Sequence, residues 1–139
     1  SEMCIRDRPQ AAPPRKKAQG GRPTKEAAAQ LERRILDVAA GLFAAQGYAA
    51  TSMEQVADAC QAGKDTIYRR YASKSALFTA MMERFRGEIV AELEACMAAD
   101  GPPEERLRRY ARALLGVNLR PQLVALNRVA LGEACRPRA

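Results

Sequence analysis

The stretch that most constrains the fold runs from Thr51 to Lys74 and predicts two short helices joined by a tight turn. Thr51 and Glu54 have the spacing of a capping box, which predicts that the first helix begins there. Apolar side chains then recur at helical spacing until Gly63, the residue best able to leave helical dihedrals. A second helix is expected from Lys64, so this stretch predicts a helical hairpin.

The second helix of the hairpin has few apolar side chains, because only Ile67 and one side of each tyrosine are suited to point inward. A helix of this kind fits the DNA major groove, which admits a single helix and presents base edges to its N-terminal side chains. Here those side chains are Lys64, Asp65 and Thr66. The alternative is an ordinary surface hairpin, since helical hairpins occur in many folds.

Other polar side chains near the hairpin are suited to bind backbone phosphates through a phenol or an ammonium group. They are Tyr68, Tyr71 and Lys74. Arg22, beside Gly and Pro, is an extended cation that suits a narrow minor groove, with a plain linker as the alternative. The predicted DNA-binding residues are Thr51, Ser52, Lys64, Asp65, Thr66, Tyr68, Arg69, Tyr71, Lys74 and Arg22.

Charge is concentrated at the N-terminus. The chain has a formal net charge of +7, and residues 1–25 contribute +5 of it, from seven basic and two acidic side chains. A basic arm attached to a helix-turn-helix points to a polyanionic partner, whereas a solvated solubility tail is the alternative. We expect residues 1–23 to be disordered, and residues 1–8 not to be native sequence.

Composition favours an all-α fold and argues against several kinds of site. Apolar residues make up 47% of the 139 residues but aromatic residues only 5%, and alternating β-branched runs are lacking. Histidine is absent and the four cysteines have no C-x-x-C spacing, so we expect no metal, no cofactor and no catalytic residue. A cysteine could serve as an oxidant sensor, or simply be a buried inert thiol.

No apolar run is long enough to cross a bilayer, and no signal peptide is recognisable. The scattered cysteines also do not suggest a disulfide framework, which fits a reducing compartment. These features predict a cytoplasmic protein that does not associate with a membrane.

Three motifs follow one another in register. They are F-x-x-x-G-Y at Phe43–Tyr48, T-S-hydrophobic-x-x-V-A at Thr51–Ala57, and K-x-T-I-Y-x-R-Y-x-S-K-x-x-L at Lys64–Leu77. With these motifs, residues 25–85 resemble the N-terminal domain of TetR/AcrR-type transcriptional regulators. Gln61 stands where that family often has Gly, so the turn must form with a residue that is disfavoured in the left-handed conformation.

The resemblance implies an all-α fold: a three-helix helix-turn-helix DNA-binding domain over residues 24–72, then a long connecting helix and a partial regulatory domain over residues 73–139. It also implies a dimer on a palindromic double-stranded operator, and a small-molecule effector whose binding moves the connecting helix. Met81, Met82 and Phe85 are candidates to line the effector pocket, with plain core as the alternative. A helical protein-interaction module without DNA readout is the alternative function.

The remaining helices are predicted from caps and breaks at about Lys25–Gln46, Ser73–Ala99, Pro103–Leu119 and Pro121–Ala134. Regulators of the resembled family usually continue for several more helices, which complete the cavity and form the dimer interface. We therefore interpret the chain as part of a longer regulator and expect an exposed apolar face on the helices after Ser73.

Overall fold

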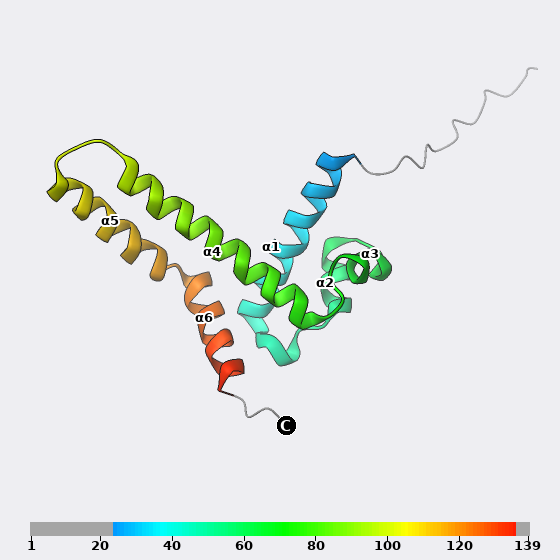
Figure 1. The fold of residues 1–139 in the computed structure, drawn as a ribbon. Coiled ribbons are helices and arrows are strands. Elements are labelled where there is room, and N and C mark those ends of the chain that lie inside the picture. The colour runs from blue at the N-terminus through cyan, green and yellow to red at the C-terminus, as the bar shows by residue number, and fades with distance from the viewer. Residues whose placement is uncertain (1–23, 136–139) are drawn as a thin grey trace, which may run out of the picture.

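The computed structural model describes residues 24–135, which form six α-helices and no strand, so the predicted all-α class is confirmed (Figure 1). The helices are α1 (Lys25–Ala50), α2 (Met53–Cys60), α3 (Lys64–Arg70), α4 (Lys74–Ala98), α5 (Pro103–Asn118) and α6 (Pro121–Ala134). Among residues 24–135, none of the helices combines the length and the hydrophobicity needed to cross a membrane.

The first helix begins where the sequence predicts and is interrupted directly after its predicted end. The hydroxyl of Thr24 accepts a hydrogen bond from the backbone N–H of Ala27 at 3.2 Å, which caps the N-terminus. Gly47 breaks the helical geometry with a φ of 83°, a conformation that favours glycine. The regular helix therefore breaks directly after Gln46, its predicted end, and one further short turn continues beyond the kink to Ala50.

One hydrophobic core joins the first three helices to α4. Ile35, Phe43, Val56 and Ile67 are all fully buried in the same cluster, so α1, α2 and α3 share one core. Leu77 and Met81 bring α4 into this cluster, and Leu126 brings in α6. An aromatic group reinforces the contact with α4, because the rings of Phe43 and Phe78 meet edge to face at 5.0 Å.

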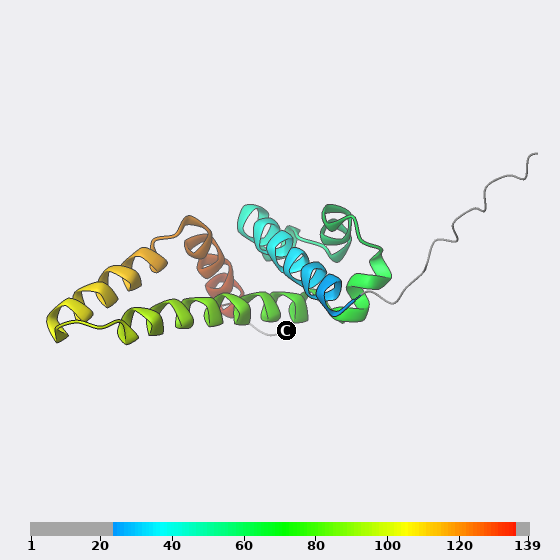
Figure 2. The ribbon, with the colours of Figure 1, turned by 90° about the horizontal axis from the view of Figure 1, so that it is seen from above.

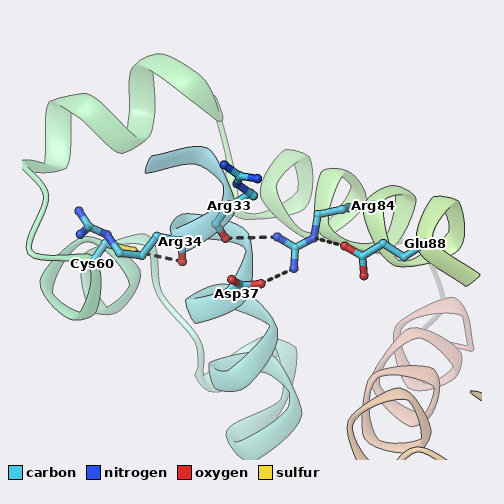
Figure 3. A network of polar contacts seen from close by, with 6 residues as sticks. All are labelled: Arg33, Arg34, Asp37, Cys60, Arg84 and Glu88. Carbon is cyan, nitrogen blue, oxygen red and sulfur yellow. Dashed lines mark hydrogen bonds and ion pairs between the residues drawn. The ribbon is translucent and has the colours of Figure 1, made fainter. Parts of the chain in front are cut away.

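The long helix α4 extends from the helical hairpin at one end of the molecule to α5 at the other (Figures 1 and 2). Ser73 caps its start, since the Ser73 hydroxyl accepts from the backbone N–H of Ala76 at 3.1 Å. Arg84, three turns into the helix, reaches α1: its guanidinium donates to the carbonyl oxygen of Arg33 at 3.2 Å and to the carboxylate of Asp37 (Figure 3). The same guanidinium also pairs with Glu88 at 3.3 Å.

Helix α5 runs back along α4, and α6 packs against α1. Two arginines of α5 cap the C-terminus of α4: Arg106 donates to the carbonyl oxygen of Met97 at 3.1 Å, and Arg109 to that of Ala99 at 3.0 Å. Arg109 also donates to the carbonyl oxygen of Asp100 at 3.0 Å. Within α5, Glu104 and Arg108 form an ion pair one turn apart, at 2.8 Å.

The expected apolar surface on the later helices is present. Large exposed apolar side chains on α4 to α6 and their connections are Val90, Met97, Leu107, Leu114, Leu115, Leu119, Val124 and Leu131. Leu107 and Leu114 lie on the solvent-exposed side of α5. Helix α5 has two apolar stripes, and the one that contains Tyr110 and Val117 turns toward its neighbours.

Candidate nucleic-acid interface

Helix α2 is capped one residue later than the sequence pattern suggests. The hydroxyl of Ser52 accepts from the backbone N–H of Gln55 at 3.2 Å, and the side-chain oxygen of Gln55 accepts from the Ser52 N–H at 2.9 Å. The capping box is therefore formed by Ser52 and Gln55, and the predicted box of Thr51 and Glu54 is wrong. The Ser52 hydroxyl faces the first turn of α2, and Glu54 is left without a capping role.

Thr51 is a structural residue, because only 2% of its surface is exposed. Its hydroxyl donates to the carbonyl oxygen of Gly47 at 2.8 Å and accepts from the side-chain amide of Gln46 at 3.3 Å. A buried hydroxyl with both partners satisfied cannot reach a phosphate. The prediction that Thr51 contacts DNA is therefore corrected: Thr51 fixes the junction between α1 and α2.

The turn between α2 and α3 depends on Gln61. This residue adopts the left-handed conformation, with φ 52° and ψ 37°, at the position where the resembled family often has Gly. Its backbone N–H donates to the carbonyl oxygen of Asp58 at 3.0 Å. Gly63 also leaves helical geometry, but at φ −63° and ψ 142°, which any residue can adopt, and it offers no side-chain cap to α3.

Helix α3 presents most of its polar side chains to solvent. Ile67 is fully buried and anchors the helix, whereas Lys64, Asp65 and Arg69 are exposed and Thr66 is half-buried. Tyr68 is 38% exposed. Because α2 and α3 lie at the end of the molecule away from α5, no described helix covers this surface (Figures 1 and 2). The structure therefore brings the predicted base-reading residues together on one accessible helix.

Tyr71 and Lys74, by contrast, have partners within the fold. Tyr71 is buried in the core, and this burial raises the pKa of its phenol, so the prediction that it contacts a phosphate is corrected. The ammonium of Lys74 donates to the carbonyl oxygen of Tyr48 at 2.8 Å and lies 4.3 Å from the centroid of the Tyr48 ring. A phosphate contact by Lys74 stays a prediction. Arg22 and the rest of the basic arm lie outside the described residues.

An ion pair that sequence analysis missed links the two helices of the hairpin. The ammonium of Lys64, the first residue of α3, lies 2.6 Å from a carboxylate oxygen of Glu54 on α2. This hydrogen bond lowers the pKa of Glu54 and raises the pKa of Lys64. Lys64 also lies 5.7 Å from the centroid of the Tyr68 ring. The sequence pattern indicates only a capping role for Glu54. Its pairing with Lys64 depends on how α3 packs against α2, which the pattern does not show.

The candidate effector residues are separated by the fold. Met81 is fully buried in the core, so its predicted place in a pocket is wrong. Met82 and Phe85 do line a groove of about 500 Å³ between α4 and the α5–α6 junction. Most of its wall is apolar, and the polar side chains on it include Glu83 and Arg86. Helical periodicity made all three residues candidates, but the packing of α4 against α1 placed Met81 on the core side.

Comparison with known proteins agrees with this geometry. Residues 35–81 match the family model of bacterial regulatory proteins of the tetR family. The HTH-type transcriptional regulator AcrR of Shigella flexneri is 35% identical over 82 residues, which cover 57% of this chain and 38% of that protein.

Two solved structures show the same arrangement of helices. A TetR-like transcriptional regulator from Rhodococcus sp. RHA1 is 31% identical with a TM-score of 0.64, covering 76% of this chain and 59% of that one. The flavonoid-responsive regulator FrrA is 32% identical with a TM-score of 0.53, and the match covers 78% of this chain and 55% of FrrA. The chain thus spans less than two thirds of the length of each of these relatives. In sequence and in fold, the chain is similar to the TetR/AcrR family of transcriptional regulators, whose family model matches residues 35–81.

Proposed function

We propose that the chain is part of a sequence-specific DNA-binding transcriptional regulator and that α3 is its recognition helix. The observation that carries this proposal is the asymmetry of α3, which is anchored by the buried Ile67. At its N-terminus, Lys64 and Asp65 are exposed and Thr66 is half-buried. In helix-turn-helix proteins, the N-terminal residues of the second helix contact base edges in the major groove. The relationship to AcrR, a transcriptional regulator, supports the same role.

The exposed residues of α3 divide by the chemistry that they offer. Asp65 can accept a hydrogen bond from a cytosine amino group, and Thr66 can bond either kind of base edge. Tyr68 and Arg69, farther along the helix, are suited to the phosphate backbone, with Lys74 as a further candidate. Asp65 and Thr66 are therefore proposed specificity residues, and Tyr68, Arg69 and Lys74 position the helix on the duplex.

The regulator would act as a homodimer on a palindromic operator, because two-fold symmetry places two recognition helices in successive major grooves. Its partner would be chromosomal DNA, which places its action in the cytoplasm. This is binding chemistry rather than catalysis, and repression follows when the bound dimer blocks transcription.

Ligand response is supported by the connection between the groove and the hairpin. Met82 and Phe85 line the groove on α4, and Arg84 on the same helix binds α1. A small molecule that favours one position of α4 would thereby shift the position of the DNA-binding helices. The relative FrrA is a flavonoid-responsive regulator, which supports a small-molecule effector, and the mostly apolar wall of the groove favours an effector with apolar surface.

Gel shifts with the promoter region of its own gene test the proposal. Preferred binding to a palindromic duplex over random DNA, with affinity that falls steeply as salt rises, is the expected result. Equal binding to both duplexes would contradict sequence-specific regulation. It would favour instead a protein-interaction module that uses the exposed apolar side chains of α5.

A further inference from the structure

The proposed reading surface carries no excess of positive charge. Residues 51–71, which contain α2 and α3, have three acidic side chains (Glu54, Asp58 and Asp65) and three basic ones (Lys64, Arg69 and Arg70), so this segment is formally neutral. The whole chain, in contrast, has a formal charge of +7. Since non-specific DNA affinity comes almost entirely from cations that neutralise phosphates, the hairpin contributes little to it.

The single lysine of this surface is not free. Its ammonium lies 2.6 Å from the Glu54 carboxylate, and both side chains are more than half exposed. An exposed ion pair adds little to stability, so its presence at the start of α3 calls for another explanation. A lysine ammonium has three donors, and the one used by Glu54 leaves two for a further acceptor.

We propose that Glu54 is a positioning residue for DNA readout, which holds the ammonium of Lys64 over the start of α3 so that it is presented to base edges. This inference rests on the proposed function of α3. Lysine on its own is a flexible point charge that binds any nearby phosphate. A lysine fixed by a neighbouring carboxylate loses less freedom when it meets an acceptor pair such as O6 and N7 of guanine.

Two consequences follow from this arrangement. Affinity for random duplexes is kept low, because the Lys64 charge is already compensated by Glu54. Affinity for the preferred site is retained, because the remaining donors are directed at a base rather than at the backbone. Glu54 therefore raises the ratio between specific and random binding without contacting DNA itself.

The test is a double-mutant cycle on that ratio, made in the 139-residue chain. Selection from a random duplex library first supplies a preferred site for the wild type. Dissociation constants for that site and for a scrambled duplex are then measured by fluorescence anisotropy at several salt concentrations. The variants are Glu54→Gln, Lys64→Gln and the double variant. Glu94→Gln, an equal charge change at an exposed position far along α4, serves as the matched control.

In Glu54→Gln, the specific-to-random ratio should fall by about 5- to 10-fold, because Lys64 is released to phosphates, and the salt slope on the scrambled duplex should steepen by about one. Lys64→Gln should lower the ratio to a similar extent. The double variant should be no worse than either single variant, because both changes disrupt one unit. Glu94→Gln should leave the ratio unchanged, and circular dichroism should show wild-type helix content throughout.

Three outcomes would overturn the inference. An unchanged ratio in Glu54→Gln would show that the ion pair has no part in readout. A further fall when Glu54→Gln is added to Lys64→Gln would show that Glu54 acts directly on a base instead. If the wild type itself selects no site, both the proposed function and the positioning role fail. The other two outcomes contradict only the positioning role of Glu54.

Discussion

The ammonium of Lys74 donates a hydrogen bond to the carbonyl oxygen of Tyr48 at 2.8 Å and lies 4.3 Å from the centroid of the Tyr48 ring. This contact joins the start of α4 to the last turn of α1, 26 residues earlier in the chain. It also lies beside the junction that Thr51 stabilises. The position of the hairpin relative to α4 therefore depends on buried and half-buried polar contacts, as well as on the apolar core.

Replacing Lys74 should lower stability. In Lys74→Met, the Tyr48 carbonyl loses its donor and the ring loses its cation, which should cost about 1–2 kcal/mol in the free energy of unfolding. Urea denaturation followed by circular dichroism measures the change. Lys25→Met, at the exposed first residue of α1, should change stability by less than about 0.5 kcal/mol. Equal midpoints for the two variants would show that the Lys74 contact adds nothing.

The buried hydroxyl of Thr51 should also matter. Thr51→Val keeps the shape of the side chain but leaves the Gly47 carbonyl and the Gln46 amide without their partner, at a cost of about 1–2 kcal/mol. Thermal or urea unfolding measures it. Thr79→Val, at an exposed position of α4, is the matched substitution and should have little effect. If Thr51→Val leaves the free energy of unfolding unchanged, the hydroxyl of Thr51 has no structural role.

Thiol labelling should distinguish the cysteines of the described chain. Cys60 is buried and its thiol pKa is raised by that burial, whereas Cys135 is exposed. Under native conditions at mildly alkaline pH, a thiol-specific reagent should modify Cys135 quickly and Cys60 only as the protein unfolds. Peptide mapping by mass spectrometry reports each site. Rapid native labelling of Cys60 would instead favour the oxidant-sensor interpretation.

Stability should decline on the alkaline side. Burial raises the pKa of Cys60 and of Tyr71 in the folded chain, so the folded state binds these protons more tightly than the unfolded state. The protonated side chains contribute fully to the free energy of unfolding below the pKa values of the unfolded state, about 8.5 for Cys and about 10 for Tyr. This contribution is lost as pH rises through the higher pKa values of the folded state. Urea midpoints between pH 7 and 11 measure the decline.

Tyr71→Phe removes one of the ionisations that contribute to this decline. Its unfolding midpoint should therefore fall less than that of the wild type above about pH 10. Tyr68→Phe, at an exposed tyrosine of α3, is the control and should follow the wild-type curve. If Tyr71→Phe follows the wild-type curve as well, burial of the Tyr71 phenol does not govern alkaline stability.

Several features of the fold could be predicted because local chemistry determines them. Ser73 caps α4 and Pro121 starts α6, as expected from capping preferences and from the fixed φ of proline. Ile67 could be identified as the anchor of α3, since it is the only aliphatic side chain in a polar helix. The strained turn at Gln61 followed from the resemblance to a family that often has glycine there.

Other features depend on packing that one sequence does not reveal. Thr51 and Ser52 are both good caps, and only the burial of Thr51 against Gly47 decides between them. The two apolar stripes of α5 are equivalent in pattern, and contact with α4 and α6 selects the one that includes Val117. The pairing of Glu54 with Lys64 crosses the turn between two helices, so no periodicity within either helix predicts it.

The central claim, that α3 reads DNA sequence, is tested most directly by parallel selection from a random duplex library with the wild type, Thr66→Ala, Asp65→Ala and Tyr68→Ala. The account predicts a preferred site for the wild type and altered base preferences for Thr66→Ala and Asp65→Ala. Tyr68→Ala should keep the wild-type preference and bind every duplex more weakly. Identical preferences in all four proteins, or no enrichment by the wild type, would contradict the assignment of α3 as the recognition helix.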